Sequence, residues 1–565
     1  MPQNGPEASD GAESAATRVT ALPAFRDVTA ESGVRALHEA DLSEACRLPE
    51  PLGPGVGLLD FDGDGQLDIF VTAGGALPPE GSSERCQLWS RDSSGRFREI
   101  AATVGADIAG PAYGVACGDY DADGDEDLFV TRLGADVLLR NDGGRFVDAT
   151  ETAGVGASGF NGVAPADALG DSPGDSPGDS AQAGAFGCSA TFFDYDRDGF
   201  LDLYITQYVD WSPIREHECI LKGRRDYCSP TVYDAPTQDR LLRNLGNGSF
   251  EDATQTAGIT GHLGNGLGVV ALDFDSDGWD DLYVANDVSP AFLWHNQRDG
   301  TFAERALECG AAYSGAGVAI SGMGVVSEDL NGDGRPDLLV TNIGGQSHLG
   351  LMSRGKGFYD GSNRVGITRW SIPATAFGLI LFDQDLDGEL DLYVGNGSIQ
   401  LGEPVPGKAA MAEDDQFARW SEGRFQDATS GSGALQGRAT RAIARGDLDG
   451  DGDEDLVLTA TGDALSILRN DAPASHHWLA IDVLNQNGGY ALGATVDITL
   501  GGATQRRRVR GQESYLASSS PRIHIGLGED APQIEQVTVI WSDGEAQDIT
   551  GEVKMDSVTE VRRGV

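Results

Sequence analysis

The sequence predicts an all-β fold: a seven-bladed β-propeller followed by a small β-sandwich-like domain. An aspartate-rich turn motif occurs seven times, an aromatic strand signal also occurs seven times, and residues 475–565 alternate apolar and polar positions without either repeat. Repeats that each hold about four short strands are typical of propeller blades.

The turn motif is Asp-x-Asp-x-Asp-Gly-x-x-Asp, and successive copies begin 54 to 79 residues apart. Each copy follows an apolar run such as 56–59 and precedes a strand signal such as 67–71. We therefore expect every motif to join two neighbouring strands of one blade.

The other two strands of each repeat have signals of their own. A third strand often ends in Arg-Asn, as at 138–141, and a short aromatic strand then completes the unit. The aromatic strands are marked by Phe25, Phe97, Phe146, Phe250, Phe302, Phe358 and Phe425.

The two ends of the repeat array predict how the ring closes. Phe25 comes before the first turn motif, whereas the seventh unit has no aromatic strand of its own. We expect the segment near Phe25 to supply the fourth strand of the seventh blade, which would hide two open sheet edges. The alternative is a linear solenoid, which has no need to divide its last repeat between the chain ends.

These patterns divide the chain into a flexible N-terminal tail (1–22), a propeller (23–474) and a C-terminal domain (475–565). The propeller carries two insertions. Residues 156–187 contain Gly-Asp-Ser-Pro repeats and are expected to form a mobile loop. Residues 208–239 are rich in aromatic side chains and are expected to pack over one face of the ring.

Composition restricts the partners. Among 565 residues, Asp and Glu total 89 and Lys and Arg total 40, for a formal net charge of −49. This charge argues against nucleic acid and anionic membranes and favours cations. We find no apolar stretch of about 18 residues, so no membrane span is expected. We expect an extracellular or periplasmic protein if a signal peptide has been removed, and a cytoplasmic one if there was none.

The seven cysteines indicate an oxidising compartment only weakly. Cys219 and Cys228 lie nine residues apart and are expected to close a small disulfide loop. Cys46 and Cys86 are a second expected pair.

The turn motif has the spacing of a calcium loop. Calcium takes about six to eight oxygen ligands, and carboxylates at alternate positions of a turn point toward one centre. We expect side-chain ligands at positions 1, 3, 5 and 9 and a backbone carbonyl at position 7. Position 1 is Asp60, Asp119, Asp194, Asp273, Asp329, Asp383 and Asp447. Position 3 is Asp62, Asp121, Asp196, Asp275, Asn331, Asp385 and Asp449. Position 5 is Asp64, Asp123, Asp198, Asp277, Asp333, Asp387 and Asp451. Position 7 is Gln66, Asp125, Phe200, Trp279, Arg335, Glu389 and Asp453. Position 9 is Asp68, Asp127, Asp202, Asp281, Asp337, Asp391 and Asp455.

We expect about seven calcium ions, one per blade, because four carboxylates in one turn repel one another without a cation. Magnesium is less suited, since it retains its waters. The alternative is that these are ordinary Asp-Gly turns. We see no histidine associated with the loops, so the ions are expected to be structural rather than catalytic.

The motifs resemble those of a known family. The aspartate repeats resemble FG-GAP and VCBS repeats, as in integrin α-subunit propellers, and the runs 283–287 and 322–325 are similar to bacterial relatives of cartilage acidic protein 1. The C-terminal runs 477–479, 493–494, 514–516, 524–528 and 541–544 resemble the ASPIC/UnbV domain. This resemblance covers about residues 23–565 and implies a calcium-loaded propeller, usually exported, with a binding or adhesion role.

A basic run at 506–510 stands out in this acidic chain. One interpretation is a solvated strand face. The other is that these arginines dock the C-terminal domain on the acidic propeller.

Two functions are compatible with the sequence. The first is a calcium-stabilised binding or scaffold protein that recognises a protein, glycan or small ligand on the propeller face. The second is a biosynthetic enzyme of cyclase, lyase or group-transfer type, with its pocket at the propeller mouth and polar groups from His262, His295, His348 and Asp287. The sequence leaves open whether the protein is catalytic and identifies no catalytic residue, although we favour the binding function.

Overall fold

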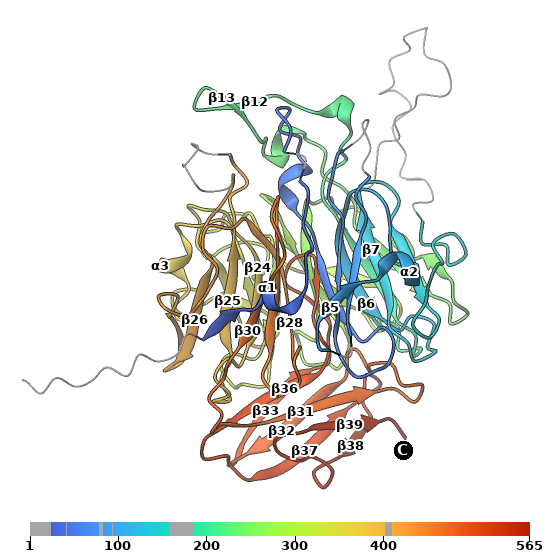
Figure 1. Ribbon diagram of the computed structural model, residues 1–565, viewed down its shortest axis with the longest axis vertical. Helices are drawn as coiled ribbons and strands as arrows, with labels where there is room; N and C mark the ends of the chain where they lie inside the picture. The colour runs from blue at the N-terminus through green and yellow to red at the C-terminus, as the bar shows by residue number, and fades with distance from the viewer. Residues whose placement is uncertain are drawn as a thin grey trace, which may run out of the picture.

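The computed structural model describes residues 24–40, 42–77, 83–92, 94–156, 186–401 and 410–564. The predicted tail at 1–22 and most of the first insertion lie outside the described residues. The fold is all-β, as predicted, with a propeller-like body above a smaller C-terminal β domain (Figure 1). Its described helices are short: α1 (Thr29–Ser32), α2 (Ala101–Val104), α3 (Thr368–Ser371) and three single 3₁₀ turns.

The body contains seven sheets, here called blades one to seven in chain order; six have four antiparallel strands, and the sheet of blade one has four antiparallel strands extended by two short ones. Blade one holds β2 (Val56–Leu59), β3 (Asp68–Val71), β4 (Gln87–Arg91) and β5 (Phe97–Glu99). Blade two holds β6 (Ala112–Gly118), β7 (Asp127–Arg132), β8 (Val137–Asn141) and β9 (Phe146–Asp148). Blade three holds β10 (Gly187–Phe193), β11 (Asp202–Gln207), β14 (Arg240–Asn244) and β15 (Phe250–Asp252). Blade four holds β16 (Gly266–Leu272), β17 (Asp281–Asn286), β18 (Phe292–Asn296) and β19 (Phe302–Glu304).

The remaining blades follow the same order. Blade five holds β20 (Val325–Glu328), β21 (Asp337–Val340), β22 (Leu349–Ser353) and β23 (Phe358–Asp360). Blade six holds β24 (Ala376–Phe382), β25 (Asp391–Asn396), β26 (Gln416–Ser421) and β27 (Arg424–Asp427). Blade seven holds β28 (Thr440–Gly446), β29 (Asp455–Ala460), β30 (Ser466–Asn470) and β1 (Phe25–Asp27).

The blades form a closed ring. Their first strands contact one another in chain order, and β28 of the last blade contacts β2 of the first. β1 pairs antiparallel with β30, with Phe25 opposite Asn470, so the N-terminal strand completes blade seven. The segment near Phe25, which the sequence predicts as the fourth strand of blade seven, takes that place.

Threonines link neighbouring blades. The hydroxyl of Thr131, at the end of the second strand of blade two, donates to the Cys188 carbonyl of blade three. Thr459 makes the same bond from blade seven to Pro54, next to blade one, at 2.7 Å. The first strands of blades two and three approach so closely that a Cβ on Gly114 would lie 2.2 Å from the Cys188 carbonyl oxygen. This contact explains glycine in the first strand of blade two.

The C-terminal domain is a sandwich of two sheets. One has the order β36 (Ile523–Gly528), β31 (His477–Leu484), β39 (Val558–Arg562). The other has the order β33 (Ala503–Arg508), β32 (Thr495–Leu500), β37 (Ile534–Ile540), β38 (Ala546–Asp548). Buried residues of both sheets share one core, to which blades two and three also contribute. The exact domain boundaries stay predictions.

A segment of this domain, here called the plug (residues 511–520), lies inside the ring. Its short strands β34 (Gln512–Glu513) and β35 (Ala517–Ser518) extend the sheet of blade one, where β35 pairs with β2. Elsewhere the Val325 amide of blade five donates to Ser514, and the Phe192 amide of blade three donates to the Gln512 side chain. Bonds to such widely separated blades require the plug to lie on the ring axis.

The second insertion (residues 208–239) covers the face of the ring opposite the C-terminal domain. It contains the hairpin of β12 (Cys219–Leu221) and β13 (Arg224–Asp226), which stands at the top of Figure 1. Cys219 and Cys228 form the expected disulfide. The expected pair of Cys46 and Cys86 is wrong, because both are free and each packs in a different hydrophobic cluster.

The plug should contribute strongly to stability. Tyr515 is fully buried, lies 5.0 Å from the Phe377 ring and donates its hydroxyl to the Leu52 carbonyl at 3.2 Å. We expect Tyr515→Ala to lower the free energy of unfolding by about 3–5 kcal/mol, because it leaves a cavity on the ring axis. Tyr515→Phe removes only the hydrogen bond and should cost about 1 kcal/mol. Urea unfolding checks both values, and equal losses would contradict the packing role.

Buried aspartates between strands should make stability depend on pH. Burial raises the pKa of Asp239 and of Asp415 to about 7, although both accept backbone and hydroxyl hydrogen bonds. Because these pKa values lie above the usual value near 4, their stabilising contribution is full below about pH 4 and is lost as the pH rises through 7. Asp239→Asn with Asp415→Asn should flatten the fall in stability between pH 5 and 8. Asp427→Asn, at an exposed site, should leave that slope unchanged in the same urea titrations.

Candidate metal sites and the clefts beside them

The seven aspartate motifs form turns of one design, here called loops one to seven after their blades. In loop one the carboxylate of Asp60 accepts the backbone amides of Asp64 at 3.0 Å and Gly65 at 2.8 Å. Gly65 adopts φ of 83°, and the equivalent glycine is left-handed in every loop. The position-4 residue is also left-handed throughout, even where it is Ala122 or Leu386, which the motif did not predict.

The position-9 aspartate anchors each loop to its blade. In blade two, one oxygen of Asp127 accepts the Tyr120 amide at 3.0 Å and the other accepts the Asn141 amide at 2.7 Å. The carboxylate therefore joins the loop to the third strand. Burial and the neighbouring loop carboxylates raise the pKa of the equivalent Asp68 to about 7 and of Asp391 to about 8.

The Arg-Asn ending of the third strand links successive blades. The side-chain amide of Asn141 donates to the Phe61 carbonyl in the loop of blade one, at 2.8 Å. Asn244 donates in the same way to Tyr120, and Asn296 donates to Tyr195. Every such asparagine connects its own loop aspartate to the preceding loop.

The residue before this position of the third strand faces the position-3 aspartate. Arg243, before Asn244, contacts Asp196 at 2.6 Å, and Arg419, before Trp420 in blade six, contacts Asp385 at 2.8 Å. In blade four the equivalent residue is His295, whose Nε2 lies 3.5 Å from Asp275. The expectation that no histidine accompanies the loops is therefore wrong. The motif could not reveal His295 because it arrives from the third strand.

The loops gather their carboxylates closely. In loops one to four, one oxygen from each of positions 1, 3 and 9 lies within 4.8 Å of the others. The position-7 amide donates to the position-5 carboxylate in all seven loops, as Gln66 does to Asp64 at 2.9 Å. That the position-7 backbone carbonyl binds a cation stays a prediction.

Several carboxylate oxygens of the loops are buried and have no hydrogen-bond partner among the described residues. They are Asp121 Oδ1, Asp194 Oδ1, Asp196 Oδ1, Asp275 Oδ1, Asp391 Oδ2 and Asp453 Oδ1. An unpaired buried carboxylate oxygen is costly, and a hard cation satisfies it. The acidic clusters can therefore hold metal ions, and their donors fit such an ion.

The C-terminal domain covers the loop side of the ring. The Asn487 side chain donates to Asp119 at 2.8 Å, and the Gly526 amide donates to Asp383 at 3.0 Å. His524 donates to the Gly452 carbonyl in loop seven at 2.7 Å. Two position-1 aspartates are thus shared between the loops and this domain.

The basic run takes part in this contact. Arg508 pairs with Asp280 of loop four, and Arg510 pairs with Glu328 at 2.8 Å. Arg506 instead pairs with Asp497 inside its own domain. Arg508 and Arg510 therefore dock the C-terminal domain on the propeller, whereas Arg506 does not.

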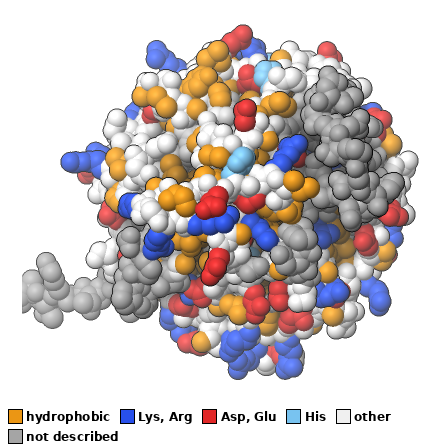
Figure 2. Space-filling view, turned by 90° about the horizontal axis from the view of Figure 1, so that it is seen from above, with side chains coloured by type: hydrophobic (Ala, Val, Ile, Leu, Met, Phe, Trp, Pro, Cys, Tyr) orange, Lys and Arg blue, Asp and Glu red, His pale blue; other side chains and the backbone are white. Residues whose placement is uncertain are grey.

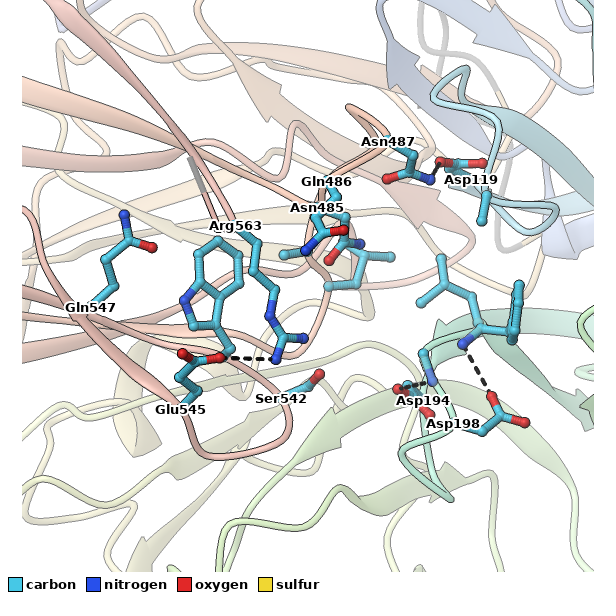
Figure 3. Close-up of a pocket in the computed structure, with 18 of the residues that line it drawn as sticks. Asp119, Asp194, Asp198, Asn485, Gln486, Asn487, Ser542, Glu545, Gln547 and Arg563 are labelled. Atoms are coloured by element: carbon cyan, nitrogen blue, oxygen red, sulfur yellow. Dashed lines mark hydrogen bonds and ion pairs between the residues drawn. The ribbon is translucent and has the colours of Figure 1, made fainter.

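A cleft of about 880 Å³ separates the C-terminal domain from loops two and three (Figure 3). Asp119, Asp194 and Asp198 point into it from the propeller. Asn485, Gln486, Asn487, Ser542 and Arg563 line the opposite wall. The cleft exists only because the two parts of the chain meet.

The polar groups suggested for an enzyme do not converge. His262 packs against Trp294, while His348 lies beside Trp370 in another blade. Asp287 accepts a hydrogen bond from the Tyr208 hydroxyl at 2.8 Å, and His295 lies by loop four. Within the described ranges, no hydrogen bond or ion pair connects any two of these four residues.

No helix in the described part of the chain is long and apolar enough to cross a membrane.

Two families match the chain. The FG-GAP-like repeat family matches residues 60–130, 223–284, 273–340 and 329–394. These ranges include loops one, two, four, five and six. The ASPIC and UnbV family matches residues 485–564.

Curated relatives carry the name cartilage acidic protein 1. The Homo sapiens protein is 28% identical over 306 residues, which cover 52% of this chain and 43% of that protein. The Mus musculus protein is 28% identical over 325 residues, covering 55% and 47%. The Xenopus tropicalis protein is 25% identical over 518 residues, covering 88% and 71%. The match thus spans less than half the length of the two mammalian relatives.

Solved structures show weaker likeness. A lectin from Agrocybe aegerita that recognises non-reducing terminal N-acetylglucosamine has a TM-score of 0.36 and 17% identity, covering 68% of this chain and 88% of the lectin. Sqt1 from Saccharomyces cerevisiae has a TM-score of 0.38 and 10% identity, covering 75% and 97%. Scores this low support no conclusion about function.

The bond from Asn487 to loop two gives a direct test of the link between loops and C-terminal domain. Asn487→Asp places a second carboxylate 2.8 Å from Asp119, so we expect a loss of about 1–2 kcal/mol in chelator and a smaller loss with calcium present. Urea unfolding in both buffers measures the difference.

Asn485→Asp is the matched control, because Asn485 lines the same cleft but donates to Tyr490 within its own domain. An equal loss for Asn487→Asp in calcium and in chelator would show that loop two holds no cation.

Proposed function

We infer that this chain, which belongs to the family in which FG-GAP-like repeats precede an ASPIC and UnbV domain, is a calcium-stabilised binding protein. The observation that carries this proposal is the set of buried loop oxygens without a hydrogen-bond partner among the described residues, which includes the position-3 aspartate of loops two, three and four. Its ligand is a protein, a glycan or a small molecule.

Calcium suits these loops better than other cations. The expected ligands at positions 1, 3, 5, 7 and 9 are all oxygens, and calcium accepts such flexible oxygen cages. Only Asn331 replaces a carboxylate among the side-chain ligands. We therefore propose one calcium ion per loop, seven in all, with a structural role.

The binding surface that we favour is the face opposite the C-terminal domain. Figure 2 shows hydrophobic side chains on this face interspersed with charged ones. The second insertion exposes Ile214, Ile220 and Val232, of which Ile214 is 81% exposed. Exposed apolar side chains on an ordered, disulfide-closed insertion are typical of a recognition element.

The filled channel supports binding over catalysis. The enzyme hypothesis placed a pocket at the propeller mouth, yet the plug occupies the ring axis and Tyr515 is fully buried there. The Cys219–Cys228 disulfide supports an oxidising compartment, so we propose an extracellular or periplasmic location.

Calcium removal tests the proposal. Binding to the folded state alone stabilises it by about 2.7 kcal/mol per site when the free ion exceeds the Kd a hundredfold. We expect EDTA to lower the thermal unfolding midpoint markedly and added calcium to restore it, as measured by scanning calorimetry.

A pair of variants localises the effect. Asp449 of loop seven and Asp471 outside the loop both contact Arg469. Asp449→Asn should reduce the calcium-dependent gain in midpoint, whereas Asp471→Asn should leave it intact. An unfolding midpoint that is the same in EDTA and in calcium would overturn the proposal.

A further inference from the structure

A second cleft between the domains is lined by five arginines. It lies between the C-terminal domain and blades four and five, with a volume of about 200 Å³. The arginines are Arg197, Arg335, Arg506, Arg508 and Arg510. Such a concentration of guanidinium groups is unexpected in a chain with only 40 Lys and Arg among 565 residues.

Two of these guanidinium groups have no carboxylate partner among the described residues. Arg335 donates to the Gly355 carbonyl at 2.8 Å. Arg197 donates to the Gly278 carbonyl and stacks over the Trp279 ring at 4.2 Å. Carbonyl partners orient a guanidinium group without neutralising its charge, so both remain available to an anion.

The other three are held in place by carboxylates. Arg506 makes a two-pronged contact with Asp497 at 2.6 and 2.7 Å, and Arg508 and Arg510 form the ion pairs to the propeller described above. Arg510 is also nine-tenths buried, and its Nε has no hydrogen-bond partner in the described part of the chain. Three guanidinium groups of the cleft are therefore fixed by carboxylates, and one of them keeps an unused buried donor.

Three carboxylates of the cleft oppose an anion: Glu328, which is paired with Arg510, and two that belong to the loops. Asp273 and Asp329, the position-1 residues of loops four and five, line the same cleft. Without cations, the eight expected side-chain ligands of these loops include seven carboxylates, whose field would repel an anion. A dication in each loop neutralises four of these seven negative charges, which favours an anion beside the arginines.

We propose that this cleft binds an oxyanion, a carboxylate, sulfate or phosphate group, once loops four and five are loaded with calcium. This inference rests on the calcium loops of the proposed function. It adds a ligand class and a dependence: the anion and calcium strengthen each other's binding by the same factor, because linkage between two sites is reciprocal.

Titration calorimetry on the full chain tests this at low ionic strength, where charge interactions are least screened. The probes are inorganic sulfate, inorganic phosphate and glucuronate, each added to protein in calcium and in EDTA. We expect at least one to bind in calcium, at least tenfold more weakly in EDTA, and to raise the calcium affinity by the same factor. Which probe binds distinguishes sulfate, phosphate and carboxylate sources.

Matched variants separate a specific site from general attraction. Arg197→Gln and Arg335→Gln should each weaken anion binding about tenfold; because Arg197 and Arg335 belong to loops three and five, the calcium-dependent stabilisation of each variant is measured beside it. Arg507→Gln removes the same charge from β33, the strand whose Arg506 and Arg508 line this cleft, but Arg507 itself lines a different cleft, so it should change anion binding less than twofold.

The outcomes are distinguishable. Calcium stabilisation without any anion binding overturns this inference alone, and so does anion binding that is equal in EDTA and calcium. Failure of calcium to stabilise the chain overturns the proposed function as well. Equal effects of Arg335→Gln and Arg507→Gln would mean attraction to the whole surface rather than to this cleft.

Discussion

Crowded carboxylates at the seven loops are the constraint on which the rest of the structure depends. Every loop brings four acidic or amide side chains to one turn and buries the last of them at the start of the second strand. Backbone amides satisfy part of this charge, as Asp64 and Gly65 do for Asp60. The buried carboxylate oxygens that accept no hydrogen bond either bind a cation or lower the stability of the fold.

The same loops hold the ring together. Asp127 accepts an amide from its own third strand, and Asn141 on that strand reaches back to the loop of the preceding blade. A disturbance in one loop is therefore felt in two blades. Since Asp119 and Asp383 also accept hydrogen bonds from the C-terminal domain, the loop side of the ring is a shared interface rather than a solvated edge.

Local repeats allowed much of this to be predicted, whereas long-range contacts did not. The seven motifs, the four strands per unit and the strand at Phe25 follow from spacing and alternation, because each signal lies within a few residues. The plug could not be predicted in this way. In the sequence, Ser514 and Tyr515 look like any polar-aromatic run. Only the fold brings them to their partners Val325 and Leu52, which lie about 190 and 460 residues away along the chain. His295 beside Asp275 and the separation of Cys46 from Cys86 were missed for the same reason.

The position of the plug has a consequence for recognition. A propeller with an open axis can bind ligands in its channel, but here the chain itself fills that space with hydrogen bonds to most of the blades. A ligand of the proposed binding function would then use the outer face with the second insertion, or the clefts where loops meet the C-terminal domain. Trp541 and Ser542 line both described clefts, so one turn of that domain separates them. Neither cleft would exist without the C-terminal domain or without the ring, so only the docked arrangement of the two presents these clefts.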